Sequence, residues 1–398
     1  MMNRLKNGKE NMRQCGPCGV FASAVLFIAI LAGILYLIFA PKQTFSEEEN
    51  RVLEPFPQMT LASVRDGSYM KSIESFVGDH FMLRKSFMSL NTRAQLLMGK
   101  HDLGSDYSKT PAEGGVYFGK NDHIYEVLLP NRIDTFRRNV AGFKLFAENA
   151  EIPFYMLPVP SGSQEQTDNL PVDAPNHDQH GELNAIRKAL DGKATVIDLF
   201  GTLSDRTGED CYFKTDHHWN AYGAYRGYSA LIAAMGETPA PISDFDFQVG
   251  SNAFYGTLYS KAILDTQQPD TLLLPVYKKQ MKLTQQTGKQ TRDSIYWAEF
   301  LQKKDKYSVF LGGNHSVDVV KNAQAKGGKK LLILKDSYAN SMIPFLVVHF
   351  SEIHIIDLRY YNQDIYRYIK QNGIDEAAAI YSIKQLCDVT VGNKLTVR

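Results

Sequence analysis

Two short segments hold the residue types from which a serine nucleophile and its base can be built. Asp216 and His218 lie two residues apart in the run Tyr-Phe-Lys-Thr-Asp-His-His-Trp-Asn, and Ser337 follows Asp336 after an apolar run. In an extended chain, residues i and i+2 point to the same side. The Asp216 carboxylate can therefore fix one imidazole tautomer of His218 while the other ring nitrogen faces a serine. The pattern predicts covalent catalysis at Ser337, with His218 as general base.

Each of these residues also has a structural interpretation. Ser337 could cap a helix that continues through Phe345, and Asp216 could cap a helix that begins near Trp219. If the helix after Ser337 forms, its amide groups and dipole would favour a developing oxyanion. His217 raises the possibility of zinc, but a third ligand would be needed and the other histidines show no ligand spacing. We therefore predict no metal and no other cofactor.

Short apolar runs predict the scaffold that must position these residues. Near-continuous apolar strands that alternate with helices are typical of a parallel sheet covered on both faces. We therefore predict an α/β sandwich over residues 100–398. A serine directly after such a strand lies where α/β sheets bind their ligands. The expected strands are 153–159, 195–200, 330–335, 353–358 and 377–383.

The remaining segments predict the elements around this sheet. Apolar residues at helical spacing predict helices in 61–100, 131–149 and 221–235. Two apolar and aromatic runs flank turn-forming residues in 114–130, which predicts a hairpin. The polar stretch 237–325 is expected to hold loops and an insertion.

One uncharged segment of 22 residues, 19–40, is long enough to cross a bilayer and too long for the apolar part of a signal peptide. Four bases precede it and only Lys42 follows it closely, so the positive-inside rule places residues 1–18 in the cytoplasm and the rest outside. We predict a single-pass cell-membrane protein with an extracytoplasmic catalytic domain. Residues 41–99 are expected to form a linker and a helical region.

Composition excludes some classes of protein. The 398-residue chain is 44% hydrophobic and 22% charged, as globular proteins are. Residues 41–398 carry 40 bases and 42 acids, and this near-neutral balance argues against a nucleic-acid partner.

The four cysteines leave several possibilities open. Cys15 and Cys18 precede the span, where acylation or no role is favoured over a zinc site. Cys211 and Cys387 would lie outside the membrane, where a disulfide is permitted but the sequence does not decide whether one forms.

The run that contains Asp216, His218 and Trp219 resembles the motif that names the DHHW family. That family is similar to the alginate O-acetylation proteins AlgJ and AlgX, which have an SGNH-hydrolase-like domain. Their matching motif reads Asp-x-His-Trp, and their nucleophile lies downstream in a strand that ends in Asp-Ser, here Asp336-Ser337. Segments 45–57, 79–84, 114–126 and 357–362 also resemble the family.

The resemblance implies a serine-dependent O-acyltransferase, most simply an O-acetyltransferase, that modifies an exported or cell-surface polysaccharide. It also implies a circularly permuted SGNH-like sheet and a multispanning acyltransferase partner of the MBOAT type as acyl donor. An O-acetylesterase with the same triad, or a non-catalytic polysaccharide-binding scaffold, would be the alternatives. The sequence departs from the family at Lys335, where the Gly of the Gly-Asp-Ser form is expected.

Further residues are candidates for the substrate site. The oxyanion is expected on the Ser337 amide and at least one more donor, with Asn340 and Asn314 as candidates. The predicted substrate-binding residues are Trp219, Tyr338, Asn340, Arg359 and Tyr360. For Trp219, packing beside the triad is favoured and a sugar-stacking platform is the alternative, whereas Arg359 could equally be structural.

Overall fold

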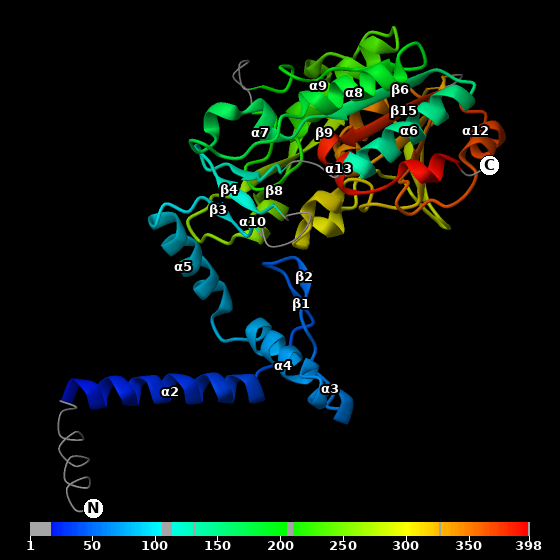
Figure 1. Ribbon diagram of the computed structural model, residues 1–398. Coiled ribbons are helices and arrows are strands. Elements are labelled where there is room, and N and C mark those ends of the chain that lie inside the picture. Colours follow the sequence, from blue (N-terminus) through cyan, green and yellow to red (C-terminus); the bar gives the residue numbers. More distant parts are fainter. Residues whose placement is uncertain (1–16, 106–113, 130–132, 205–209, 326–327, 397–398) are drawn as a thin grey trace, which may run out of the picture. The chain divides into compact units, whose positions relative to one another are not determined.

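The chain divides into two units, Met1–Asn91 and Thr92–Arg398, in the computed structural model (Figure 1). The structure describes residues 17–105, 114–129, 133–204, 210–325 and 328–396. Cys15 and the side chain of Cys18 lie outside this description, as does most of the predicted cytoplasmic segment 1–18.

The first unit begins with helix α2 (Pro17–Phe39). Its residues Gly19–Phe39 are long and apolar enough to cross a membrane, which agrees with the predicted span 19–40. At about 1.5 Å per residue, the helix matches a hydrocarbon core of about 30 Å.

The segment after the span is more structured than a linker. Strands β1 (Phe45–Ser46) and β2 (Arg51–Val52) pair as a small antiparallel hairpin. The Arg51 guanidinium donates to Glu49 (2.9 Å) and Asp79 (2.9 Å), and the Arg84 side chain also donates to Glu49 (2.8 Å). These ion pairs connect the hairpin to the helices that follow it in the chain. The helices are α3 (Leu61–Arg65), α4 (Ser68–Asp79) and α5 (Arg84–Leu97).

An eight-stranded sheet forms the centre of the second unit. Five neighbouring strands are parallel, and three antiparallel strands extend the sheet on one side. The order is β11 (Gln290–Arg292), β10 (Leu283–Thr287), β12 (Val317–Asn322), β14 (Glu352–Ile356), β13 (Lys330–Lys335), β15 (Glu376–Ser382), β6 (Phe154–Val159) and β7 (Thr195–Val196). The predicted α/β fold is confirmed, and each predicted strand is present, although β7 is shorter than expected.

Side chains on β13 alternate between two apolar layers, so both faces of the sheet are buried. Leu331 and Ile333 pack in a core with helices α9 (Ala221–Ala234) and α11 (Ile343–Leu346). Leu332 and Leu334 pack in a second core on the other face, with α6 (Ile133–Asn149), α8 (His180–Leu190), α12 (Ile365–Asn372) and α13 (Ile383–Asp388). This two-sided burial explains the continuous apolar run of the strand.

The polar region 237–325 contains more strands than the sequence suggests. Strands β8 (Phe245–Phe254) and β9 (Asp270–Tyr277) form a separate antiparallel pair, and β10, β11 and β12 join the main sheet. The expectation of loops and an insertion was therefore wrong for much of this region. The strands were missed because polar residues occupy some of their core positions. Buried Gln285, for example, donates to the Leu311 carbonyl (2.7 Å) and the Asp318 carboxylate (3.1 Å).

The predicted hairpin in 114–130 is present as β4 (Val116–Phe118) and β5 (Ile124–Glu126), and β4 also pairs with β3 (Asp102–Leu103). Short helices α7 (Gly162–Glu165) and α10 (Thr257–Lys261) complete the unit. The 3₁₀ turns are Thr167–Asn169, Ile242–Asp244, Ala298–Gln302, Lys306–Val309, Ser337–Ser341 and Gly392–Thr396. Among the described residues, no disulfide joins the buried Cys211 and Cys387.

Glycines on α9 let Trp219 pack against the helix. A Cβ added at Gly227 would lie 2.7 Å from two carbons of the Trp219 ring, and one at Gly223 would lie 2.8 Å from the Trp219 Cβ. The indole is completely buried and donates to the Tyr338 carbonyl (2.9 Å). It therefore supports the turn that begins at Ser337.

Gly227→Ala should lower the free energy of unfolding by about 1–3 kcal/mol, because the added methyl overpacks a filled core. Gly181→Ala is the matched control, since nothing lies within 4 Å of a Cβ at this exposed position of α8. That change should stabilise the helix by about 0.5–1 kcal/mol. Chemical denaturation of the full chain in detergent measures both. Equal effects of the two changes would contradict the packing role of Gly227.

Candidate active site

Asp216, His218 and Ser337 form one continuous chain of hydrogen bonds. His218 Nδ1 lies 2.5 Å from Asp216 Oδ1, and His218 Nε2 lies 2.7 Å from Ser337 Oγ. Since the carboxylate can only accept, Nδ1 carries the proton and Nε2 accepts from the serine hydroxyl. The structure therefore brings together the three side chains that the sequence analysis selected, although His218 and Ser337 are 119 residues apart in the sequence.

The turn after β13 presents Ser337 to this chain. Asp336, not Ser337, is the capping residue: its carboxylate accepts from the Tyr338 amide (2.9 Å) and the Ser382 amide (2.7 Å). The hydroxyl of Ser337 remains available to His218. The helix expected through Phe345 is a five-residue 3₁₀ turn followed by the four-residue α11, so little helix dipole reaches the serine.

Asp216 is almost fully buried, and α10 supplies much of its hydrogen bonding. Its Oδ2 accepts from the Thr257 amide (2.7 Å) and the Thr257 hydroxyl (3.1 Å), while Oδ1 also accepts from the His218 amide (3.0 Å). A Cβ at Gly256 would lie 2.3 Å from Oδ2, so the close approach requires glycine there. The cap of α9 is Asn220, so Asp216 does not cap that helix.

The surroundings keep Asp216 ionised. Burial alone would raise its pKa, but the electrostatic influence of the adjacent His217 and His218 and the hydrogen bonds from His218 and Thr257 outweigh it. The pKa of Asp216 is therefore held well below its ordinary value of 3.8. An ionised Asp216 fixes the His218 tautomer that can accept the serine proton.

Two more side chains fix the turn that carries the base. The Asp270 carboxylate accepts from the amides of Lys214 (2.8 Å) and Thr215 (2.9 Å), immediately before Asp216. Tyr307 stacks on the His218 ring, with centroids 4.0 Å apart, and its hydroxyl donates to the Ser337 carbonyl (3.0 Å). Sequence reasoning selected neither residue, because both lie in the polar region whose strands it did not identify.

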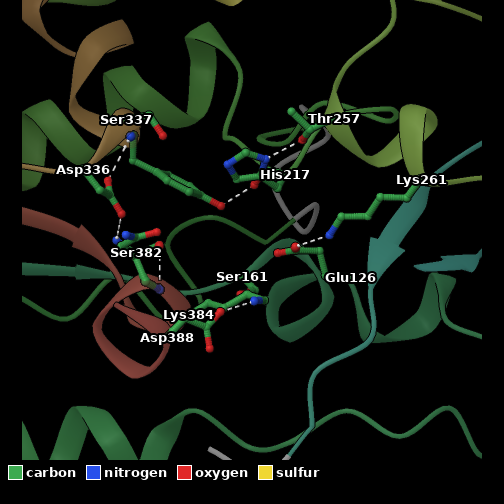
Figure 2. A pocket seen from close by; sticks show the side chains of 12 residues that line it. Glu126, Ser161, His217, Thr257, Lys261, Asp336, Ser337, Ser382, Lys384 and Asp388 are labelled. Atoms are coloured by element: carbon green, nitrogen blue, oxygen red, sulfur yellow. Dashed lines mark hydrogen bonds and ion pairs between the residues drawn. The ribbon is translucent and has the colours of Figure 1, made fainter. Parts of the chain in front are cut away.

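A pocket of about 190 Å³ opens beside Ser337 (Figure 2). Polar and charged side chains line it, and two pairs of opposite charges lie in its wall: Lys261 lies 3.0 Å from Glu126, and Lys384 pairs with Asp388. The lining residues are Glu126, Ser161, His217, Thr257, Lys261, Asp336, Ser337, Tyr338, Ser382, Lys384, Gln385 and Asp388.

Most of these lining residues were missed in the sequence. Ser161 and Ser382 could have been found, because each lies at the carboxyl end of a parallel strand, as Ser337 does. Lys261 and Glu126 come from elements outside the main sheet, and no sequence pattern brings them to the site.

The structure separates the five predicted substrate-binding residues. Tyr338 lines the pocket, but Trp219 and Asn340 are almost completely buried and do not. A sugar-stacking role for Trp219 is incompatible with its burial. Arg359 pairs with Asp357 (Nε to Oδ1, 2.9 Å), and Tyr360 is exposed; neither lines the pocket.

The candidate oxyanion donors also need correction. Asn340 Nδ2 is directed to the Gly313 carbonyl (3.4 Å) and Asn314 Oδ1 (3.3 Å), and the buried Lys335 ammonium donates to the same Asn314 oxygen (2.6 Å). These bonds engage the Asn340 amide nitrogen and the Asn314 side-chain oxygen, and neither asparagine lines the pocket. The Ser337 amide, in contrast, has no hydrogen-bond partner within the described part of the chain.

Asp216, His217 and His218 also offer ligand atoms within 4.8 Å of one another, close enough for a metal ion. Both Nδ1 atoms and the His218 Nε2 already have hydrogen-bond partners. A metal would have to displace the bonds that orient Ser337.

Residues 182–356 match the model of the DHHW protein family, and this range includes Asp216, His218 and Ser337. These residues therefore resemble a DHHW-family domain. No curated protein sequence matches it significantly.

The chain is also similar to several solved structures. A DHHW family protein from Eubacterium siraeum is 22% identical with a TM-score of 0.60, over 71% of this chain and 97% of that one. PatB1 from Bacillus cereus is 22% identical with a TM-score of 0.59, over 70% and 98%. The O-acetyltransferase domain of AlgJ from Pseudomonas putida matches more weakly, at 13% identity and a TM-score of 0.46 over 69% and 93%. The first two share the α/β fold of this chain.

Asp216→Asn should change how stability depends on pH. Because the folded-state pKa of Asp216 is depressed, its contribution is present above about pH 4 and is lost as the pH falls below its ordinary value of 3.8. The midpoint temperature of thermal unfolding of the full chain, measured between pH 6 and pH 3, should therefore fall more steeply with decreasing pH for the wild type than for Asp216→Asn. Asp191→Asn, at the exposed end of α8, should follow the wild type. Parallel curves for Asp216→Asn and the wild type would contradict the depressed pKa.

Proposed function

We propose that this DHHW protein is a membrane-anchored, extracytoplasmic O-acyltransferase that acetylates hydroxyl groups of an exported or cell-surface polysaccharide. The observation that carries the proposal is the hydrogen-bond chain Asp216–His218–Ser337, whose serine opens onto a polar pocket. The order carboxylate, imidazole, hydroxyl is the arrangement that activates a serine for acyl transfer.

In the first half-reaction, Ser337 Oγ attacks the carbonyl carbon of an acyl donor while its proton passes to His218 Nε2. The tetrahedral intermediate collapses when the bond to the leaving group breaks, and His218 returns the proton to that group. An acyl-serine and a neutral His218 remain. Ionised Asp216 stabilises the imidazolium that forms between these steps.

In the second half-reaction, a sugar hydroxyl attacks the acyl-serine. His218 takes the hydroxyl proton and gives it to Ser337 Oγ as the serine–acyl bond breaks. The pocket supports a sugar acceptor and a short acyl group, because serine hydroxyls and paired charges line it and there is no apolar channel for a long chain among its lining residues.

The oxyanion needs two donors. The Ser337 amide is one candidate. Gln385 supplies the other, because its side-chain nitrogen is buried in the wall of the pocket and has no hydrogen-bond partner within the described residues.

Structural relatives suggest a reagent for testing the nucleophile. PatB1 has also been solved with a sulfonyl adduct, at 23% identity to this chain, a TM-score of 0.57 and coverage of 69% and 97%. Sulfonyl fluorides transfer a sulfonyl group to an activated nucleophile and release fluoride, so they can mark Ser337 without an acyl donor.

Ser337→Ala and His218→Asn should each lower the rate of cleavage of a chromogenic acetyl ester by several orders of magnitude. Gln385→Leu should cost about 10²–10³-fold, as removal of one oxyanion donor does. The measurement follows ester cleavage and acetylated sugar with and without added oligosaccharides, using the full chain in detergent. Ser243→Ala, at an exposed position that does not line the pocket, is the control. A phenylmethylsulfonyl adduct on the wild type, located by mass spectrometry, should be lost in Ser337→Ala.

Each outcome decides between functions. Ser337-dependent acetylation of a sugar supports the transferase, and the preferred sugar indicates the polymer. Ser337-dependent release of acetate that no sugar affects would replace the transferase with an esterase. Equal rates for wild type and Ser337→Ala would overturn the triad and leave a binding scaffold.

The acyl donor and the anchor belong to the same proposal. An extracytoplasmic enzyme does not meet cytoplasmic acetyl-coenzyme A, so an MBOAT-type membrane protein would pass the acetyl group across the bilayer. The anchor at 19–40 would keep the enzyme beside this partner. The partnership can be tested by cross-linking the full chain in cells and purifying it. Recovery of the chain with no multispanning protein cross-linked to it would contradict the partnership.

The orientation has its own test. Protease added outside intact spheroplasts should digest residues 41–398 and leave a tag fused before residue 1 intact. Disruption of the cells should expose the tag as well. A protected catalytic domain in intact spheroplasts would reverse the predicted orientation, and recovery of the full chain in the soluble fraction would exclude the anchor.

A further inference from the structure

A second imidazole is anchored to the carboxylate that orients His218. His217 Nδ1 lies 2.7 Å from the Thr257 hydroxyl oxygen, and the Thr257 hydroxyl is 3.1 Å from Asp216 Oδ2. His218 reaches the other oxygen, Oδ1, directly. The two imidazole rings lie against each other, with centroids 3.9 Å apart. One buried carboxylate therefore positions both histidines of the motif.

The hydrogen bonds fix the tautomer of His217. The Asp216 carboxylate can only accept, so the Thr257 hydroxyl donates its proton to Oδ2. The same hydroxyl oxygen must then accept from His217 Nδ1, which places the ring proton on Nδ1. His217 Nε2 is left with a lone pair, as in His218. Desolvation and then the charge of His218 lower the pKa of His217 to about 4, so the ring is neutral at physiological pH.

This lone pair is available to a ligand. Within the described part of the chain, His217 Nε2 has no hydrogen-bond partner, whereas His218 Nε2 is bonded to Ser337. His217 lines the pocket together with Ser337, and its side chain is 30% exposed (Figure 2). In that view the ring nitrogen that is not bonded to Thr257 lies on the side of Ser337. The main chain of His217 is held by the Tyr338 hydroxyl, which donates to its carbonyl.

We propose that His217 Nε2 accepts a hydrogen bond from a hydroxyl of the acceptor and so orients an acceptor that carries two neighbouring hydroxyl groups, such as the vicinal diol of a sugar. The inference rests on the proposed transferase and assigns its acceptor subsite. One hydroxyl attacks the acyl-serine and gives its proton to His218, which passes it to Ser337 Oγ. The neighbouring hydroxyl keeps its proton and donates a hydrogen bond to His217. No further proton acceptor is required.

Two substitutions separate the two ring nitrogens of His217. In His217→Asn, the side-chain amide can still donate to Thr257 from the position of Nδ1, but the acceptor atom at Nε2 is gone. In His217→Gln, the longer side chain can place its carbonyl oxygen near the position of Nε2. The full chain in detergent is given a chromogenic acetyl ester and a vicinal-diol oligosaccharide, and the ratio of acetylated sugar to released acetate is measured.

His217→Asn should lower this ratio by about tenfold, the effect of one lost hydrogen bond, and should lower ester cleavage by less. His217→Gln should keep the ratio within about threefold of the wild type. An acceptor in which the neighbouring hydroxyl is replaced by hydrogen should lower the wild-type ratio to that of His217→Asn, and should not lower the ratio of His217→Asn further.

An unchanged ratio in His217→Asn would overturn the acceptor role. Equal losses of sugar acetylation and ester cleavage would also overturn it, because they would mark a structural role of His217 only. Failure of the proposed function would look different. A wild type that cleaves the ester but acetylates no sugar would overturn the transferase and this inference together. Activity independent of Ser337 would overturn the proposed triad.

Discussion

The site depends on one buried negative charge. Burial of a carboxylate is costly unless hydrogen bonds and opposite charges compensate it. The Asp216 carboxylate receives the amide and ring N–H of His218 and the amide and hydroxyl of Thr257. Asp270, which accepts from the amides just before Asp216, fixes the turn itself. Only glycine fits at 256, because a side chain there would collide with Asp216. The hydrogen bonds to this carboxylate therefore hold together two segments about forty residues apart in the sequence. The same contacts orient the imidazole rings of His217 and His218.

The central sheet supplies the other half of the geometry. Ser337 follows the parallel strand β13, Ser382 ends the adjacent strand β15, and Ser161 follows β6, which pairs with β15. All three serines lie at the same edge of the sheet and line the pocket. The residue before Asp336 is a completely buried lysine where the family's motif has glycine. Lys335 reaches Asn314 (2.6 Å), and the Asp357 carboxylate lies 3.8 Å from its ammonium. Burial lowers the pKa of Lys335 to about 8. The departure at this position is therefore accommodated by a polar network beneath the serine turn.

The sequence predicted the parts of the molecule that depend on local pattern. Apolar runs identified the five parallel strands of the described sheet, and four of these, β6, β13, β14 and β15, are largely buried on both faces. The Asp-x-His spacing and the strand-to-serine junction selected the residues of the hydrogen-bond chain. The sequence could not identify strands such as β10 and β12, whose core positions Gln285 and Asp318 are polar and satisfied by each other. It also could not find Thr257, because only the folded chain places α10 against Asp216. Trp219 was open to two interpretations until its burial excluded contact with a sugar.

The balance between transfer and hydrolysis follows from the size of the site. A pocket of about 190 Å³ has room for several water molecules, each of which occupies about 30 Å³ in the liquid. Steric exclusion of water from an acyl-serine is therefore insufficient in this conformation. If the protein is a transferase, a sugar hydroxyl must compete with water by being held in the attacking geometry, which can be worth several orders of magnitude in rate. His218 Nε2 can accept a proton from either nucleophile. A second, neutral acceptor such as His217 favours only a nucleophile with a neighbouring hydroxyl, because a water molecule in the attacking position carries no second hydroxyl to reach it.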